Sequence, residues 1–143
     1  MGELRMERTF RASPERLFRY LTDAKSVAGW WGPEGMTVGA SRLDLGRPGP
    51  WWMALSDPSG RAMEMSGTVI SVDPPRGLEL TMIVPGTGVE STVRLEVKPQ
   101  GTGSQLTLIQ SGISDEMIAW GQRGWIGPLN RLTVMADAGA AAA

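Results

Sequence analysis

The chain has 143 residues, the size of one ordinary domain, and contains neither cysteine nor histidine. Disulfides, thiol nucleophiles, imidazole bases and Cys/His zinc sites are therefore excluded. The 14 basic and 15 acidic side chains leave a formal charge of -1, which provides no overall field to attract nucleic acid or an anionic membrane. The aromatic residues are dominated by six Trp, and nine Met accompany them.

The first ten residues, MGELRMERTF, carry charges and are not followed by the apolar core of a secretory signal. No stretch approaches the roughly 20 apolar residues of a membrane helix, so we expect a cytoplasmic protein that does not insert into membranes. No linker or repeat divides the sequence, which predicts one domain over residues 1–137. The alanine-rich residues 138–143 are expected to form a frayed tail.

The N-terminal part predicts one strand and two short helices. Residues 3–10 alternate between apolar and polar side chains, as a half-buried strand does. Ser13 can cap the helix that follows, Pro14 suits its first position, and Asp23 can cap a second helix that runs through residues 30–31.

The middle of the chain predicts six strands. Apolar alternation starts at Met36 and shifts parity near residues 41–42, which indicates a β-bulge. Residues 57–60, Asp-Pro-Ser-Gly, form a strong hairpin turn. The expected later strands cover about residues 51–55, 62–72, 78–84, 89–98 and 106–110.

A long helix is predicted from Ser114 to about residue 136. Its apolar face holds residues at helical spacing, namely Ile118, Trp125, Leu129, Leu132 and Ala136. Pro128 lies inside this pattern and cannot donate to the carbonyl of Gly124, so we expect a kink or a restart there. The element order β-α-α-β-β-β-β-β-β-α predicts an α+β fold in which a curved antiparallel sheet of about seven strands wraps the last helix.

Six stretches occur in an order that resembles a known bacterial family. They are ASPERLFRYLTD (12–23), GWWGPEGMTV (29–38), SVDPPRGLELT (71–81), ESTVRLEV (90–97), LTLIQSGISDE (106–116) and GWIGPLNRL (124–132). In these stretches the chain resembles the family named for the C-terminal domain of the heat-shock-protein-90 ATPase activator, which belongs to the START-like (SRPBCC) superfamily.

This resemblance implies the helix-grip fold of pollen-allergen-like proteins, with a cavity between the sheet and the last helix. The superfamily includes ligand carriers, polyketide cyclases and co-chaperone domains, so the resemblance does not imply one activity. Many relatives carry histidines early in the last helix, where this chain has Met117, Trp120 and Gln122, so the identity of a ligand is not carried over.

The tryptophans and methionines are the candidate residues for such a cavity, with ordinary core packing as the alternative for each. Of Trp51 and Trp52, one should face inward, and the other should contact a dimer partner or be shielded by a loop. Trp120 should pack at the helix edge or form part of a lid. The candidate ligand-binding residues are Trp30, Trp31, Met36, Trp51, Met53, Met65, Met82, Gln110, Met117, Trp125 and Leu129.

Glu64 is the possible acid or base: it would have a raised pKa if it pointed inward and would be merely solvated if it pointed outward. No catalytic constellation, cofactor motif or metal spacing is found.

The first hypothesis is therefore that the chain binds a small hydrophobic molecule, such as a lipid or polyketide. The alternative is a polyketide cyclase- or dehydratase-like enzyme that uses Glu64 and other polar groups of the cavity. The third is a co-chaperone-like domain that binds heat-shock protein 90 in a stress response. A homodimer is expected, and no nucleic-acid partner.

Overall fold

The computed structural model describes residues 2–32, 35–84 and 87–142, with backbone alone for 139–142. Seven strands and three helices follow one another in the predicted order. The strands are β1 (Gly2–Phe10), β2 (Thr37–Arg42), β3 (Gly49–Ser56), β4 (Ala62–Asp73), β5 (Gly77–Ile83), β6 (Glu90–Gln100) and β7 (Gly103–Ile113). The helices are α1 (Pro14–Thr22), α2 (Ala24–Trp30) and α3 (Asp115–Ala142).

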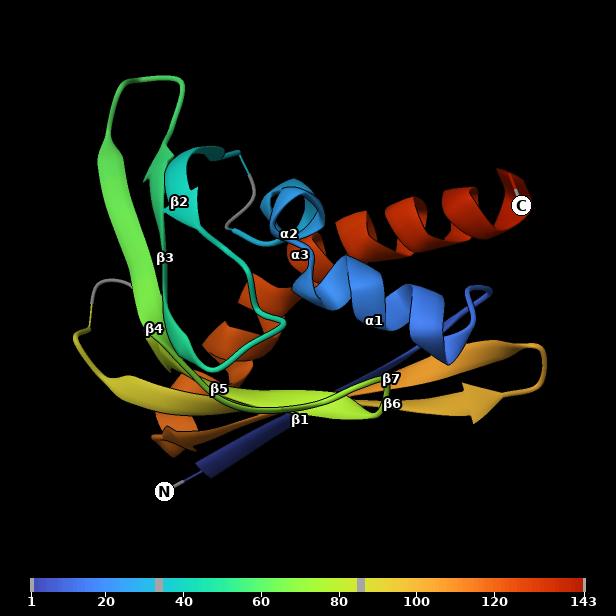
Figure 1. Cartoon of the computed structure of the whole chain (residues 1–143). Helices are drawn as coiled ribbons and strands as arrows, with labels where there is room; N and C mark the ends of the chain where they lie inside the picture. Colours follow the sequence, from blue (N-terminus) through green and yellow to red (C-terminus); the bar gives the residue numbers. More distant parts are fainter. Residues whose placement is uncertain (1, 33–34, 85–86, 143) are drawn as a thin grey trace.

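The strands form one antiparallel sheet in the order β1-β7-β6-β5-β4-β3-β2. Short turns make consecutive strands neighbours from β2 to β7, and β1 closes the sheet by pairing with β7. The sheet bends, so that β1, β7, β6 and β5 form a floor while β4, β3 and β2 rise as a wall, and all three helices lie in the angle between them (Figure 1). This is the predicted α+β fold, a curved sheet that grips the last helix.

The two short helices begin where the sequence predicts. The Ser13 hydroxyl accepts a hydrogen bond from the Arg16 backbone N–H at 3.2 Å, and the Asp23 carboxylate accepts one from the Ser26 N–H at the same distance. Each bond satisfies an amide that the first turn of a helix leaves without a partner.

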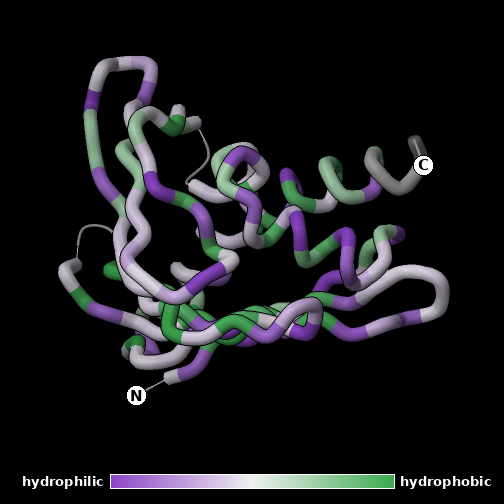
Figure 2. Tube along the Cα trace, viewed as in Figure 1, coloured by the Kyte–Doolittle hydropathy of each residue, from purple (hydrophilic) through white to green (hydrophobic). Residues whose placement is uncertain are grey.

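Alternation along the strands separates the core from solvent. In β6, Ser91, Val93, Leu95 and Val97 are buried and the residues between them are exposed or half-buried. Hydrophobic and hydrophilic segments alternate along the floor strands, while the tips of the β3–β4 and β6–β7 hairpins are neutral to hydrophilic (Figure 2). The buried faces and the helices share one core.

The structure differs from the sequence prediction in α3 and at two strands. The helix continues through Pro128 without a restart and ends at Ala142 rather than near residue 136, in a run of alanine, the residue with the highest helix propensity. The register shift in β2 falls between Val38 and Ser41, slightly before the expected bulge, and β7 extends beyond residues 106–110 at both ends. None of the helices in the described ranges combines the length and the apolarity that a membrane crossing requires.

A candidate ligand cavity between the sheet and the last helix

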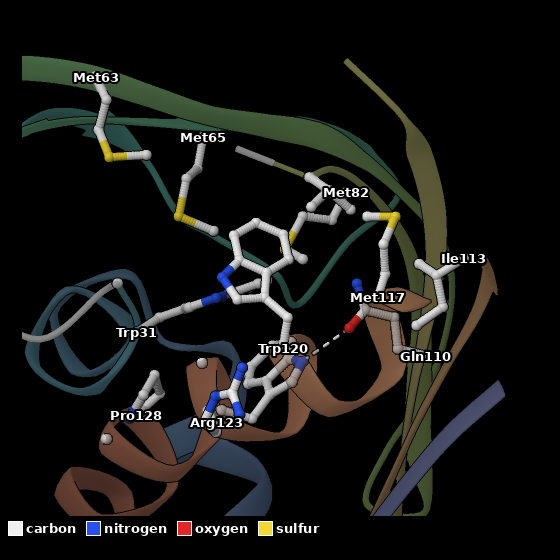
Figure 3. Close-up of a pocket in the computed structure, with 16 residues that line it drawn as sticks. Trp31, Met63, Met65, Met82, Gln110, Ile113, Met117, Trp120, Arg123 and Pro128 are labelled. Carbon is white, nitrogen blue, oxygen red and sulfur yellow. Dashed lines mark hydrogen bonds between the residues drawn. The ribbon is translucent and has the colours of Figure 1, made fainter. Parts of the chain in front are cut away.

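A cavity of about 640 Å³ lies between the sheet wall and the first half of α3. Its lining comes from the end of α2, from β4, β5 and β7, and from α3 (Figure 3). The described lining residues are Trp31, Gly32, Met63, Met65, Met82, Val84, Gln110, Ile113, Met117, Trp120, Gly121, Arg123, Gly124, Trp125, Gly127 and Pro128.

Methionines dominate the sheet side of the cavity. Met63 and Met65 are two positions apart in β4, so the alternation of a strand places both side chains on the same face, and Met82 of β5 joins them. Glu64 lies between the two methionines and is exposed, because the same alternation turns it to the other face. Of the two orientations open to Glu64 from sequence, the structure shows the outward one.

Half of the α3 residues that line the cavity are glycine or proline. Gly121, Gly124, Gly127 and Pro128 of α3 line the cavity together with Met117. At ~100° per residue, Met117, Gly121, Gly124 and Pro128 lie on one face of the helix. A methyl group built on Gly124 would meet no atom within 4 Å, so the missing side chain there leaves open space.

Trp31 lies at the centre of a cluster of four indole rings. Its ring stacks on Trp30 with 5.6 Å between centroids and on Trp51 with 4.8 Å. Trp125 of α3 contacts it at 5.8 Å in a tilted arrangement. Aromatic contacts at these separations stabilise by about 0.5–1.5 kcal/mol each beyond the buried area, so the cluster holds α2, β3 and α3 in fixed relation around the cavity.

Two of the four rings serve as framework. The Trp51 indole N–H donates to the Thr81 carbonyl oxygen at 3.0 Å. To reach it, the ring crosses β4 over Gly67, where a Cβ atom would lie 2.7 Å from the Trp51 nitrogen. The Trp30 N–H donates to the Tyr20 carbonyl at 2.8 Å, which ties α2 to α1.

Arg131 of α3 fastens the end of α2 to the long helix. Its Nε donates to the Trp30 carbonyl at 3.1 Å, and its Nη2 donates to the Gly32 carbonyl. A cation beside the last carbonyls of a helix complements their partial negative charge. The bonds hold Trp31, which lies between these two carbonyls in sequence, against the cavity.

Gln110 is the buried polar residue of the cavity wall, with 3% of its surface exposed. Its Oε1 accepts a hydrogen bond from the Trp125 indole N–H at 2.9 Å, and its Nε2 donates to Ser91 Oγ at 2.9 Å. The Ser91 hydroxyl in turn donates to the Met82 carbonyl at 3.0 Å. This chain of bonds links α3, β7, β6 and β5, so the Gln110 amide positions Trp125 and the wall of the cavity.

Six of the eleven candidate residues named from sequence line the cavity: Trp31, Met65, Met82, Gln110, Met117 and Trp125. The other five do not. Trp30, Trp51, Met53 and Leu129 are at most 1% exposed and belong to the core, while Met36 is half-buried and packs against it. Trp51 is thus the inward residue of the 51–52 pair, and Trp52 is half-buried.

The structure adds residues that sequence reasoning did not assign to the cavity, above all the α3 glycines, Arg123 and Trp120. The sequence predicts Trp120 at the helix edge or in a lid; it is 46% exposed, and its ring extends toward Met65 and Met82 (Figure 3). The spacing of Met117, Gly121 and Gly124 by four and three residues was the available signal, since it marks a second helix face with small residues.

The charged groups are unevenly distributed around the cavity. Arg123 is the one charged residue in the described lining, which includes no Asp or Glu. In the ranges that the structure covers, no group of acidic residues could hold a metal ion. The carboxyl groups with shifted pKa lie elsewhere: hydrogen bonds from Ser59 and Arg61 lower the pKa of Asp57, and the Arg76 guanidinium lowers that of Asp73.

Comparison with known proteins places this geometry among related structures. The family model described as Activator of Hsp90 ATPase homolog 1-like protein matches residues 11–137. The crystal structure of the AHSA1 protein from Silicibacter pomeroyi has 34% sequence identity and a TM-score of 0.84, covering 94% of this chain and 96% of that chain.

Two more distant likenesses support the fold alone. A Chromobacterium violaceum protein has 24% identity and a TM-score of 0.83, over 94% of this chain and 96% of that one. The AHSA1-like protein from Aeromonas hydrophila, solved by NMR, has 19% identity and a TM-score of 0.78, over 96% and 94%. No curated protein matches the chain.

Proposed function

Because the chain belongs to the Activator of Hsp90 ATPase homolog 1-like family and its fold encloses a cavity, we propose that it binds a small hydrophobic molecule between the sheet and α3. The observation that supports this proposal is the cavity itself, whose volume of about 640 Å³ falls within the roughly 300–1,000 Å³ typical of ligand sites.

The character of the walls supports the same proposal. Most lining side chains are methionine or tryptophan, and polar groups are few. Thioether side chains adapt to the shape of an apolar guest because they are flexible and polarizable. Rigid indole rings provide large apolar surfaces that lose little conformational entropy on binding.

The enzymatic alternative lacks an acid or base among the described residues of the wall. Glu64, its best candidate by sequence, is exposed on the other face of β4, and the described lining contains no carboxylate. General acid–base catalysis requires such a group within hydrogen-bond reach of the substrate. Binding is therefore the function that the cavity supports best.

Fluorescence titration with the neutral probe N-phenyl-1-naphthylamine tests the proposal. We expect saturable binding with one probe per chain in the unmodified protein. Gly124→Leu places a side chain in the open space of the cavity and should weaken binding at least about tenfold, the effect of roughly 1.4 kcal/mol.

Ala119→Leu is the matched control, because Ala119 is exposed on the same helix and does not line the cavity. This variant should bind the probe like the unmodified protein. Absence of saturable binding, or equal binding by Gly124→Leu and the unmodified protein, would contradict the proposed function.

A further inference from the structure

We propose that the ligand of this cavity is an aromatic carboxylate, held by Arg123 and the Trp31 indole N–H at one side and by methionine thioethers at the other. This inference rests on the proposed function and names the chemical class of ligand that the same site would take.

The first observation is the charge of the wall. Arg123 lines the cavity and is exposed, which places it at the opening, and the residues that the structure describes give it no hydrogen bond or ion pair. The guanidinium group presents a fork of N–H donors that matches a carboxylate. Arg123 is the only charged side chain in the described lining, so among these residues it is the group that would attract an anion.

The second observation is the indole N–H of Trp31. The residue is 96% buried, being 4% exposed, and its N–H has no hydrogen-bond partner within the described ranges. Every fully enclosed side-chain nitrogen or oxygen among the described residues has a partner, whereas the Trp31 nitrogen has none among them, which fits a nitrogen that opens onto free space. Trp31 lines the cavity and points into it (Figure 3), so this donor faces the cavity.

Acceptors on the wall are scarce by comparison. The Gln110 Oε1 atom already accepts the Trp125 N–H at 2.9 Å. Arg123 and Trp31, in contrast, are donors alone and have no acceptor in the described structure. A guest that brings negatively charged oxygen atoms satisfies both, whereas an ammonium group, which only donates, would leave both without an acceptor.

The third observation concerns the apolar body of the ligand. In Figure 3, Trp31 and Arg123 lie on one side of the Trp120 ring, while Met82, Met117 and Ile113 lie on the other. Sulfur–aromatic contacts add about 0.3–1.5 kcal/mol each, and ring stacking adds a similar amount. An aromatic ring set between Trp120 and the methionines, with its carboxylate toward Arg123, would make both kinds of contact.

Isothermal titration calorimetry with 1-naphthaleneacetate and 1-naphthaleneacetamide tests the charge. The two probes share one ring system and differ in the carboxylate. We expect the acid to bind the unmodified protein about tenfold more tightly than the amide, because a charge-assisted hydrogen bond contributes about twice as much as a neutral one. In Arg123→Gln the acid should lose more affinity than the amide, so this preference should largely disappear.

Arg19→Gln is the control for the loss of one positive charge, because Arg19 is exposed on α1 and does not line the cavity. It should keep the full preference for the acid. Equal binding of acid and amide by the unmodified protein would overturn the assignment and leave the proposed function intact. If neither probe nor N-phenyl-1-naphthylamine binds, the proposed function fails together with this inference.

The aromatic part is tested with decahydro-1-naphthaleneacetate, the saturated form of the same skeleton. We expect it to bind at least about threefold more weakly than 1-naphthaleneacetate, since it loses the ring contacts with indole and sulfur. Equal or tighter binding of the saturated acid would overturn the aromatic assignment.

Discussion

Replacing Gln110 with methionine should destabilise the protein by breaking the buried hydrogen-bond chain that joins α3 to the sheet. Methionine is similar in length and apolar, so the change removes two hydrogen bonds of 2.9 Å with little change in volume. The Trp125 indole N–H then stays buried without an acceptor, which costs about 1–3 kcal/mol. Ser91 keeps its bond to the Met82 carbonyl, so its share is small. We expect a total loss of about 2 kcal/mol.

Guanidinium chloride denaturation, followed by tryptophan fluorescence and circular dichroism, measures this free energy of unfolding. Gln122→Met is the matched control: the same chemical change on an exposed position of α3 should stay within about 0.5 kcal/mol of the unmodified protein. Equal effects of the two substitutions would refute the reasoning.

A double-mutant cycle isolates the bond itself. Trp125→Phe removes the donor that Gln110 accepts, so the double variant with Gln110→Met no longer contains an orphaned indole N–H. The two losses should therefore sum to more than the loss in the double variant, by about 1 kcal/mol. Strict additivity would show that the hydrogen bond contributes nothing to stability.

Two further predictions concern stability. Gly124→Ala should raise the free energy of unfolding by about 1 kcal/mol in thermal denaturation, because the methyl group enters open space on a helix. Gly67→Ala should lower the free energy of unfolding, because a Cβ there would lie 1.9 Å from the Thr81 carbonyl oxygen. The reverse order of the two effects would refute the argument. Asp57→Asn should lower the melting temperature at pH 7, because the pKa of Asp57 is lowered from 3.8, chiefly by the Ser59 hydrogen bond. The stability that this carboxylate contributes is present above pH 3.8 and is lost as the pH falls through the folded-state pKa, so the difference in melting temperature between variant and unmodified protein should narrow on acidification. A difference that stays constant with pH would contradict this prediction.

The strands and helix starts follow from local patterns, which is why sequence could predict them. The alternation of Ser91, Val93, Leu95 and Val97 has the period of a strand, and it needs no knowledge of its neighbours. Ser13 caps α1 through a bond within its own turn. Such features depend on residues a few positions apart, so a single sequence contains the information.

The division between cavity and core depends on contacts between distant segments. Met53 and Met65 are cross-strand partners and share a face, yet only Met65 lines the cavity. Gly32, which follows α2, covers Met53: a Cβ built on Gly32 would lie 4.0 Å from the Met53 sulfur. Arg131 holds that end in place from a position 99 residues away from Gly32. The alternation of apolar and polar residues along β3 therefore does not reveal that Met53 is covered by a distant segment while Met65 is not.

The two faces of α3 connect the fold to the proposed function. The face toward the core has bulky residues such as Leu129 and Leu132, which are buried to 1% and 0% exposure. The face toward the cavity has glycines, including Gly124, and Pro128. In a helix interior, each glycine lowers stability by about 1 kcal/mol relative to alanine, and a proline lowers it by about 3 kcal/mol. Residues unfavourable for the helix are thus concentrated where a side chain would fill the cavity. A local conflict with helix propensity that coincides with open space is the pattern expected of a functional site. The same reasoning explains why Gly124→Ala should stabilise the helix while Gly124→Leu should weaken binding: a glycine at this position lowers helix stability but leaves room in the cavity.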